Sequence, residues 1–144
     1  MSTSPPERIA LDPDESFAEY VGHTADGRQF FLTTPFEPGG REFIALYLFD
    51  SAGKLIGARI EDLGLRATLD EERRRGLRDE WLRELGSVER NRIEVAPFTV
   101  ERFGLQFGLV PCVPEEADDP WAVEVQPGNY MAFFEPWDTG VYDT

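Results

Sequence analysis

The sequence has one cysteine, Cys112, and one histidine, His23. A single cysteine excludes a disulfide within the chain, which fits a reducing compartment. His23 has no cysteine, histidine or paired acid close to it in the sequence, so it is a poor metal ligand candidate. A catalytic thiol would need an activating base, and Cys112 has none nearby in the sequence. We therefore expect no metal site and no nucleophilic cysteine.

Targeting and cofactor signals are also missing. The N-terminal stretch MSTSPPERIALDPDES lacks the apolar core of a signal peptide. The apolar run Phe43–Phe49 has seven residues, whereas a helix that crosses a bilayer needs about 20. Neither GxGxxG nor GxxxxGK[ST] occurs, so no phosphate-binding loop is indicated. These absences predict a cytoplasmic protein with no cofactor and no membrane partner.

Basic residues are scarce: 14 stand against 28 acids, and the net charge is −14. Residues 1–27 hold six acids and one arginine, residues 28–114 hold fourteen acids and thirteen bases, and residues 115–144 hold eight acids and no base. A nucleic-acid surface needs clustered lysine and arginine, so this distribution argues against one. It favours a basic protein partner, although high net charge also simply keeps a protein soluble.

A chain of 144 residues is expected to form one domain with a real core. Residues 1–15 hold three prolines and many polar residues, and we interpret them as a flexible arm before a domain over 16–144. The fold class is predicted to be α+β, with a largely antiparallel sheet of about seven or eight strands. One amphipathic helix, over about 69–85, is expected on one face of that sheet.

The central feature is a hairpin over 41–62. Both faces of the strand Phe43–Phe49 are apolar, so we expect it to be covered on both sides. Asp50 to Gly53 suit the turn, and Ile56, Ala58 and Ile60 are predicted to share the inner face of the return strand.

Further hairpins are predicted on either side. The stretches 17–23 and 28–34 flank Asp26-Gly27, a strong turn signal, which extends the central hairpin to a four-stranded meander. The stretches 121–126 and 129–135 flank Pro127-Gly128 and form the last hairpin.

The helix has recognisable ends. Thr68 with Glu71 fits a capping box, and Gly86 fits a left-handed C-terminal cap. Leu77, Trp81 and Leu85 recur every four residues and should lie on the sheet. The basic run 73–75 is neutralised by the acids around it, so it predicts a solvated face and not a phosphate contact.

The stretch 98–110 contains FGLQFGLV and is predicted to be extended throughout. Gly104 and Gly108 would then share one face of a strand, and such a smooth face lets another group approach the backbone. The approaching group is either another part of the protein, packed closely, or a ligand.

The candidate binding surface is acidic and aromatic, and it lies towards the C-terminus. The loop 111–120 holds four acids without the spacing or the glycine of a calcium-binding EF-hand. Aromatic residues among acids are typical of interfaces with basic partners, although they can also pin a tail onto the core. The candidate residues are Glu115, Glu116, Asp118, Asp119, Glu135, Trp137, Asp138, Tyr142 and Asp143.

Three functions are compatible with these patterns. The preferred one is a non-enzymatic binding protein that engages a basic macromolecule through the acidic surface. Bacterial immunity proteins against nuclease toxins are likewise small, acidic and α+β, which is an analogy of type alone. The alternatives are a small-molecule sensor with a pocket against the Gly104/Gly108 face, and a hydrolase that uses carboxylates such as Glu94, Glu101 or Glu135.

Overall fold

The structure, a computed structural model, describes residues 6–13, 20–37, 39–114, 116, 121–127, 131–133 and 140–142. These residues form one α-helix, a short 3-10 helix and twelve strands in three antiparallel sheets. In chain order the elements are β1 (Ile9–Leu11), β2 (Tyr20–Thr24), β3 (Gln29–Thr33), β4 (Arg41–Phe49), β5 (Leu55–Leu65), η1 (Arg66–Thr68), α1 (Glu71–Leu85), β6 (Val88–Arg90), β7 (Ile93–Val95), β8 (Phe98–Arg102), β9 (Leu105–Cys112), β10 (Ala122–Gln126), β11 (Met131–Phe133) and β12 (Gly140–Tyr142).

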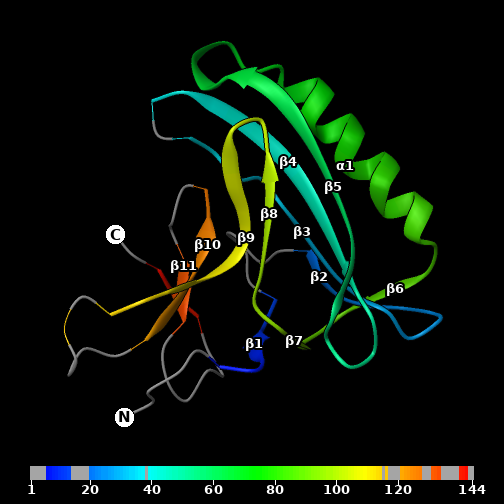
Figure 1. Ribbon diagram of the computed structural model, residues 1–144. Helices are drawn as coiled ribbons and strands as arrows, with labels where there is room; N and C mark the ends of the chain where they lie inside the picture. The colour runs from blue at the N-terminus through cyan, green and yellow to red at the C-terminus, as the bar shows by residue number, and fades with distance from the viewer. Residues whose placement is uncertain are drawn as a thin grey trace.

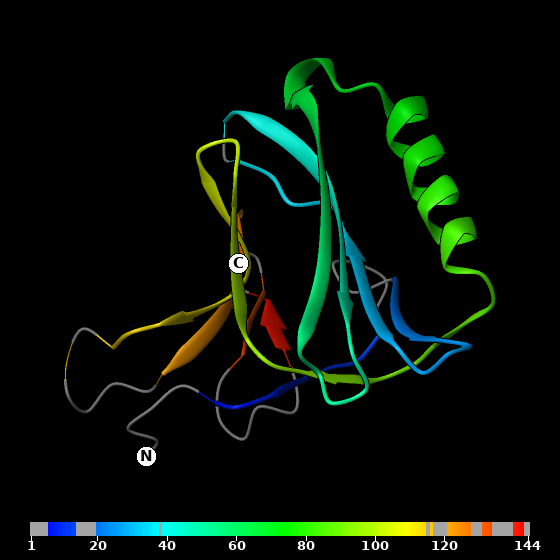
Figure 2. The same ribbon diagram turned by 45° about the vertical axis from the view of Figure 1, so that its right-hand side comes forward.

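The elements are arranged in three layers. A first sheet has the order β5-β4-β3-β2-β6, and a second has the order β12-β11-β10-β9-β8. Figure 1 shows α1 along one face of the first sheet, and the turned view of Figure 2 shows the second sheet on the opposite face. The predicted α+β class with one helix on an antiparallel sheet is confirmed. The strands are divided between separate sheets, where the sequence predicted one large sheet.

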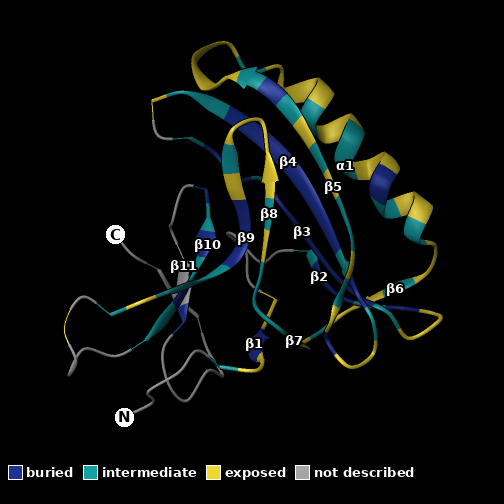
Figure 3. Ribbon diagram, in the orientation of Figure 1, coloured by how far each residue is buried: buried dark blue, intermediate teal, exposed yellow. Residues whose placement is uncertain are grey.

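The predicted meander over β2–β5 is confirmed, and β4 lies between β3 and β5 and is buried over most of its length (Figure 3). Phe43, Tyr47 and Phe49 point into a core shared with the second sheet. Ile44 and Leu46 point into a second core beneath α1. The doubly apolar strand is therefore covered on both sides, as its sequence predicts.

The return strand β5 departs from the prediction at Ile56. Phe49 pairs with Leu55 and Leu48 pairs with Gly57, so Ile56 is an extra residue in a β-bulge. The bulge puts Leu55 on the core side with Ala58 and Ile60, and leaves Ile56 54% exposed. The expectation that Ile56 shares the inner face was wrong because strict alternation fails at a bulge.

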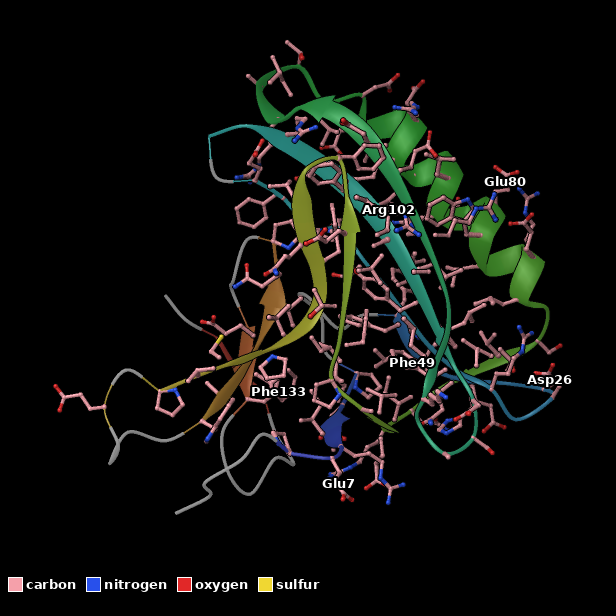
Figure 4. All side chains as sticks on the ribbon, in the orientation of Figure 1. Glu7, Asp26, Phe49, Glu80, Arg102 and Phe133 are labelled. Atoms are coloured by element: carbon pink, nitrogen blue, oxygen red, sulfur yellow. The ribbon has the colours of Figure 1, made fainter. Side chains whose placement is uncertain are left out.

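The space between the two sheets holds the larger core. The first sheet contributes Phe31 and Phe49, and the second contributes Phe107, Val123 and Phe133. Figure 4 labels Phe49 and Phe133, one from each sheet. The edges formed by β5 and β8 also approach each other, so the two sheets meet along one side.

The helix begins at Glu71, two residues later than predicted. Asp70 is its N-cap, and the Asp70 carboxylate accepts hydrogen bonds from the backbone N–H groups of Glu72 and Arg73. Thr68 belongs to η1, so the predicted capping box was wrong. Gly86 is the C-cap, as predicted, but its φ of 81° and ψ of −147° do not correspond to the predicted left-handed conformation. The predicted apolar face of the helix is confirmed: Trp81 is buried, and Leu77, Leu82 and Leu85 pack against the same core.

Among the described helices, none is long and apolar enough to cross a membrane.

The stretch 98–110 is a hairpin and not one continuous strand. Phe103 and Gly104 have φ of 54° and 77° and turn β8 back along β9. Gly104 therefore lies in a turn, and only Gly108 lies on a strand. A Cβ at Gly108 would lie 2.4 Å from the backbone oxygen of Phe98 and 2.8 Å from its ring. Phe98 occupies the face that the sequence left open to a ligand, so the predicted Gly104/Gly108 pocket was wrong.

The N-terminal arm contains a strand where flexible chain was expected. Ile9, Ala10 and Leu11 form β1, pair with β7 and are at most 3% exposed. The short apolar run pairs with Ile93–Val95 and joins the larger core. The free energy gained by burying these side chains exceeds the conformational entropy lost on ordering them, even though the surrounding residues are polar and rich in proline.

Candidate functional site

Two acidic segments start and finish at the same end of the second sheet. Cys112, the last residue of β9, lies opposite Ala122, the first residue of β10. Phe133, the last residue of β11, pairs with Val123 on one side and with Gly140 of β12 on the other. Segments 113–121 and 134–139 are therefore both anchored at this end of the sheet, which we call the acidic end. They contain six acids and no base.

Only part of the predicted surface can be located. Glu116 is exposed. Tyr142 belongs to β12 and lies opposite Met131, so it is at the other end of the strand from segment 134–139. Three strand residues span about 7 Å, and Tyr142 is therefore set apart from the acidic end. The remaining predicted residues lie outside the described part of the chain: Glu115, Asp118, Asp119, Glu135, Trp137, Asp138 and Asp143.

A polar contact at the base of the acidic end was missed by the sequence reasoning. The Cys112 thiol donates a hydrogen bond to Glu124 Oε1, with a Sγ–Oε1 distance of 2.7 Å. The Gln126 side-chain amide donates to the same oxygen over 3.3 Å. Burial and the Glu124 carboxylate together raise the pKa of the thiol to about 12. The thiol is therefore neutral at pH 7, the opposite of an activated nucleophile. Only the register of β9 against β10 could have predicted this contact.

Nine of the described acids before residue 115 form ion pairs with arginine. Eight arginines form ion pairs with carboxylates of the described residues: Arg28, Arg41, Arg59, Arg66, Arg73, Arg74, Arg78 and Arg92. Glu42 is the most buried of these acids, and both Arg66 and Arg74 contact it. Because residues 115–144 contain no base, the acids of the acidic end have no cation of their own segment to pair with.

Catalytic arrangements find little support in the described residues. His23 is the histidine that could activate Cys112 from a distance in the sequence, but His23 Nδ1 contacts the Asn91 side chain and Cys112 contacts Glu124. Glu94 and Glu101 are both exposed and stand on separate strands, β7 and β8. Within the described ranges, no three histidine, cysteine or acidic side chains lie close enough to hold a metal ion.

Three hollows in the described surface lie around the first sheet. The largest, about 660 Å³, lies beside the N-terminus of α1 and is lined by Glu42, Arg66 and Arg74. A second, of about 330 Å³, lies between β5 and the C-terminal half of α1. A third, of about 300 Å³, is lined by His23, Val88 and their neighbours. None of the three is lined by Gly104 or Gly108.

The sequence matches no protein-family model and has no significant match among curated proteins or solved structures. The functional argument for this chain therefore depends on its own residues and their geometry.

Proposed function

We propose that this chain is a non-enzymatic binding protein and that the acidic end engages a basic protein. The observation that carries the proposal is the strand register, which anchors segments 113–121 and 134–139 at one end of the second sheet. Acids that are far apart in the sequence can therefore act on one partner. A cytoplasmic location belongs to the same proposal, since the single cysteine fits a reducing compartment.

The charge balance supports a cationic partner. Residues 28–114 are nearly neutral and pair many of their arginines internally, whereas residues 115–144 hold eight acids and no base. Clustered charge of one sign accelerates the encounter with a partner of the opposite sign and excludes partners of the same sign. Trp121 and Trp137 belong to the two anchored segments, and tryptophan often supplies the apolar contacts at the centre of an interface.

The test compares three double variants with the same change in charge. E115Q/E116Q and E135Q/D138N each remove two acids from one segment of the acidic end. E72Q/E80Q is the control, because Glu72 and Glu80 are exposed on α1, and α1 and the second sheet lie on opposite faces of the first sheet (Figures 1 and 2). Each protein is used for affinity capture from an extract of the source cells, and bound proteins are identified by mass spectrometry.

We expect the wild type and E72Q/E80Q to retain the same basic protein. Both acidic-end variants should lose it, and the association rate of the purified pair should fall steeply with salt, because salt screens charge steering. Captured proteins no more basic than the extract would contradict the proposal. So would a partner that binds both acidic-end variants as tightly as it binds the wild type.

A further inference from the structure

The hollow between β5 and α1 is open because one of its lining residues, Gly57, has no side chain. Gly57 of β5 lies opposite Leu48 of β4, and a Cβ built on Gly57 would have no heavy atom within 4 Å. The hollow, of about 330 Å³, has an apolar floor made by Leu46, Leu48, Trp81 and Leu85. In Figures 1 and 2, β5 runs alongside α1 in both views.

Trp81, which lines the hollow, carries an unused hydrogen-bond donor. Trp81 is 1% exposed, and its indole Nε1–H has no hydrogen-bond partner among the described residues. Buried indole N–H groups usually find an acceptor, because an unpaired donor away from water is unfavourable. Because the Nε1 atom is enclosed, an acceptor brought in by a ligand would satisfy it only after the side chains around it, such as Arg59 over the ring, have moved.

Two guanidinium groups stand at the rim. Arg59 lies over the Trp81 ring, 4.7 Å from its centroid, and donates a hydrogen bond to Glu84 of α1. Arg28 lines the hollow and pairs with Asp26, which is not part of the lining. Each rim guanidinium is therefore already paired with one carboxylate, Arg28 with Asp26 and Arg59 with Glu84, and a ligand anion would have to take the place of one of them.

We propose that this hollow binds a small amphipathic acid, with an aromatic or branched apolar body and one carboxylate. Ligand pockets usually measure about 300–1,000 Å³, so this hollow suits a molecule built around a single ring. The apolar body would lie on the leucines beside Gly57. The carboxylate would accept a hydrogen bond from the Trp81 indole and pair with Arg59. This inference does not rest on the proposed function, because the hollow and the acidic end lie on opposite sides of the first sheet.

The Arg59–Glu84 pair is placed to exchange partners. Their side chains are 51% and 53% exposed, and an ion pair this exposed contributes little to stability. Arg59 can therefore leave Glu84 for the ligand at small cost. The larger hollow beside Glu42 lacks this feature, because Glu42 and Glu71 already occupy the guanidinium of Arg74.

The test uses 4-phenylbutyrate and its neutral amide, 4-phenylbutanamide, as probes. Titrations are followed by ¹H–¹⁵N NMR, in which the Trp81 indole N–H signal is assigned from its absence in Trp81→Phe. Gly57→Leu fills the hollow, and its Cβ meets no atom within 4 Å. Gly76→Ala is the matched control, because Gly76 also has open space around it but lies on α1 outside the lining.

We expect the carboxylate to shift the Trp81 indole signal and to bind at least tenfold more tightly than the amide. Gly57→Leu should abolish this shift, Gly76→Ala should leave it unchanged, and Glu84→Gln should tighten binding of the carboxylate several-fold by freeing Arg59. If Gly57→Leu does not fold, Gly57→Ala should still weaken binding. Failure of the carboxylate to move the indole signal in the wild type would overturn the proposal, as would equal binding by Gly57→Leu and Gly76→Ala.

Discussion

The Cys112 thiol lies at the base of the acidic end, and burial together with the Glu124 carboxylate raises its pKa to about 12. In the unfolded chain a cysteine has a pKa of about 8.5. At pH 8 the native thiol is almost entirely protonated, so we expect alkylation by iodoacetamide to be at least about a hundredfold slower than in urea-unfolded protein. Glu124→Gln removes the charged acceptor, lowers the pKa and should accelerate alkylation of the native protein. Equal rates for native and unfolded wild type would contradict this account of Cys112.

Tyr47 combines complete burial with an unpaired hydroxyl. Burial raises its pKa far above the ordinary value of 10. Below pH 10 both the folded and the unfolded forms are protonated, but above it the unfolded tyrosine ionises and the buried one does not. The unfolding free energy should therefore fall as the pH rises beyond 10. Tyr47→Phe removes the unpaired hydroxyl, so we expect it to be stabilising by about 1 kcal/mol at pH 7 and to reduce the alkaline loss.

That prediction is checked by urea denaturation of both proteins at pH 7 and at pH 10.5. Phe31→Tyr adds a hydroxyl to the same core and should be destabilising, which makes it a useful opposite control. A Tyr47→Phe variant several kcal/mol less stable than the wild type would mean that the hydroxyl has an acceptor in solution.

At the scale of single elements, the N-terminus of α1 is capped by a different residue from the one predicted. The sequence favoured Thr68, whereas Asp70 accepts the hydrogen bonds of the first turn. Asp70→Ala should therefore cost about 1 kcal/mol of unfolding free energy. Thr68→Ala, at an exposed position two residues earlier, should cost much less. Urea denaturation of the two variants gives the comparison, and a larger loss for Thr68→Ala would contradict the assigned cap.

The elements also show which parts of the fold the sequence can predict. The doubly apolar pattern of β4 and the Asp26-Gly27 turn act over a few residues, so β2–β5 could be predicted correctly. The turn at Phe103-Gly104 was missed because phenylalanine rarely adopts a positive φ, and its ring is held by stacking on Phe43. The bulge at Ile56 was missed for the same reason: it is visible only in the pairing of Leu55 with Phe49 and of Gly57 with Leu48.

The candidate sites were harder to predict than the strands, for a related reason. Composition alone indicated the acids of residues 115–144, but only the pairing of β9, β10 and β11 brings the ends of their two segments together. The hollow at Gly57 depends on Leu48 across the ladder and on Trp81 from a helix, so it has no signature along the chain. The division of the strands into three sheets was equally hidden, because alternation identifies a buried face without identifying what covers it.

At the scale of the whole molecule, the uneven charge should affect stability as well as binding. If the acids of the acidic end repel one another in the folded state, removing two of them is stabilising at low ionic strength. E135Q/D138N should then unfold at a higher urea concentration than the wild type in about 0.01 M salt, where the Debye length is about 30 Å. The difference should disappear in about 1 M salt, where the Debye length falls to about 3 Å.

The control for this prediction is again E72Q/E80Q, which makes the same change in net charge at a different place. Glu72 lies in the first turn of α1, where a negative charge interacts favourably with the helix dipole. Its removal should therefore be slightly destabilising at low salt, although the net charge falls equally. Opposite signs for the two variants would show that the position of the charge matters more than the total of −14. The same sign and size in both would mean that the acids of segments 113–121 and 134–139 act independently, and would remove the electrostatic basis for treating the acidic end as one binding surface.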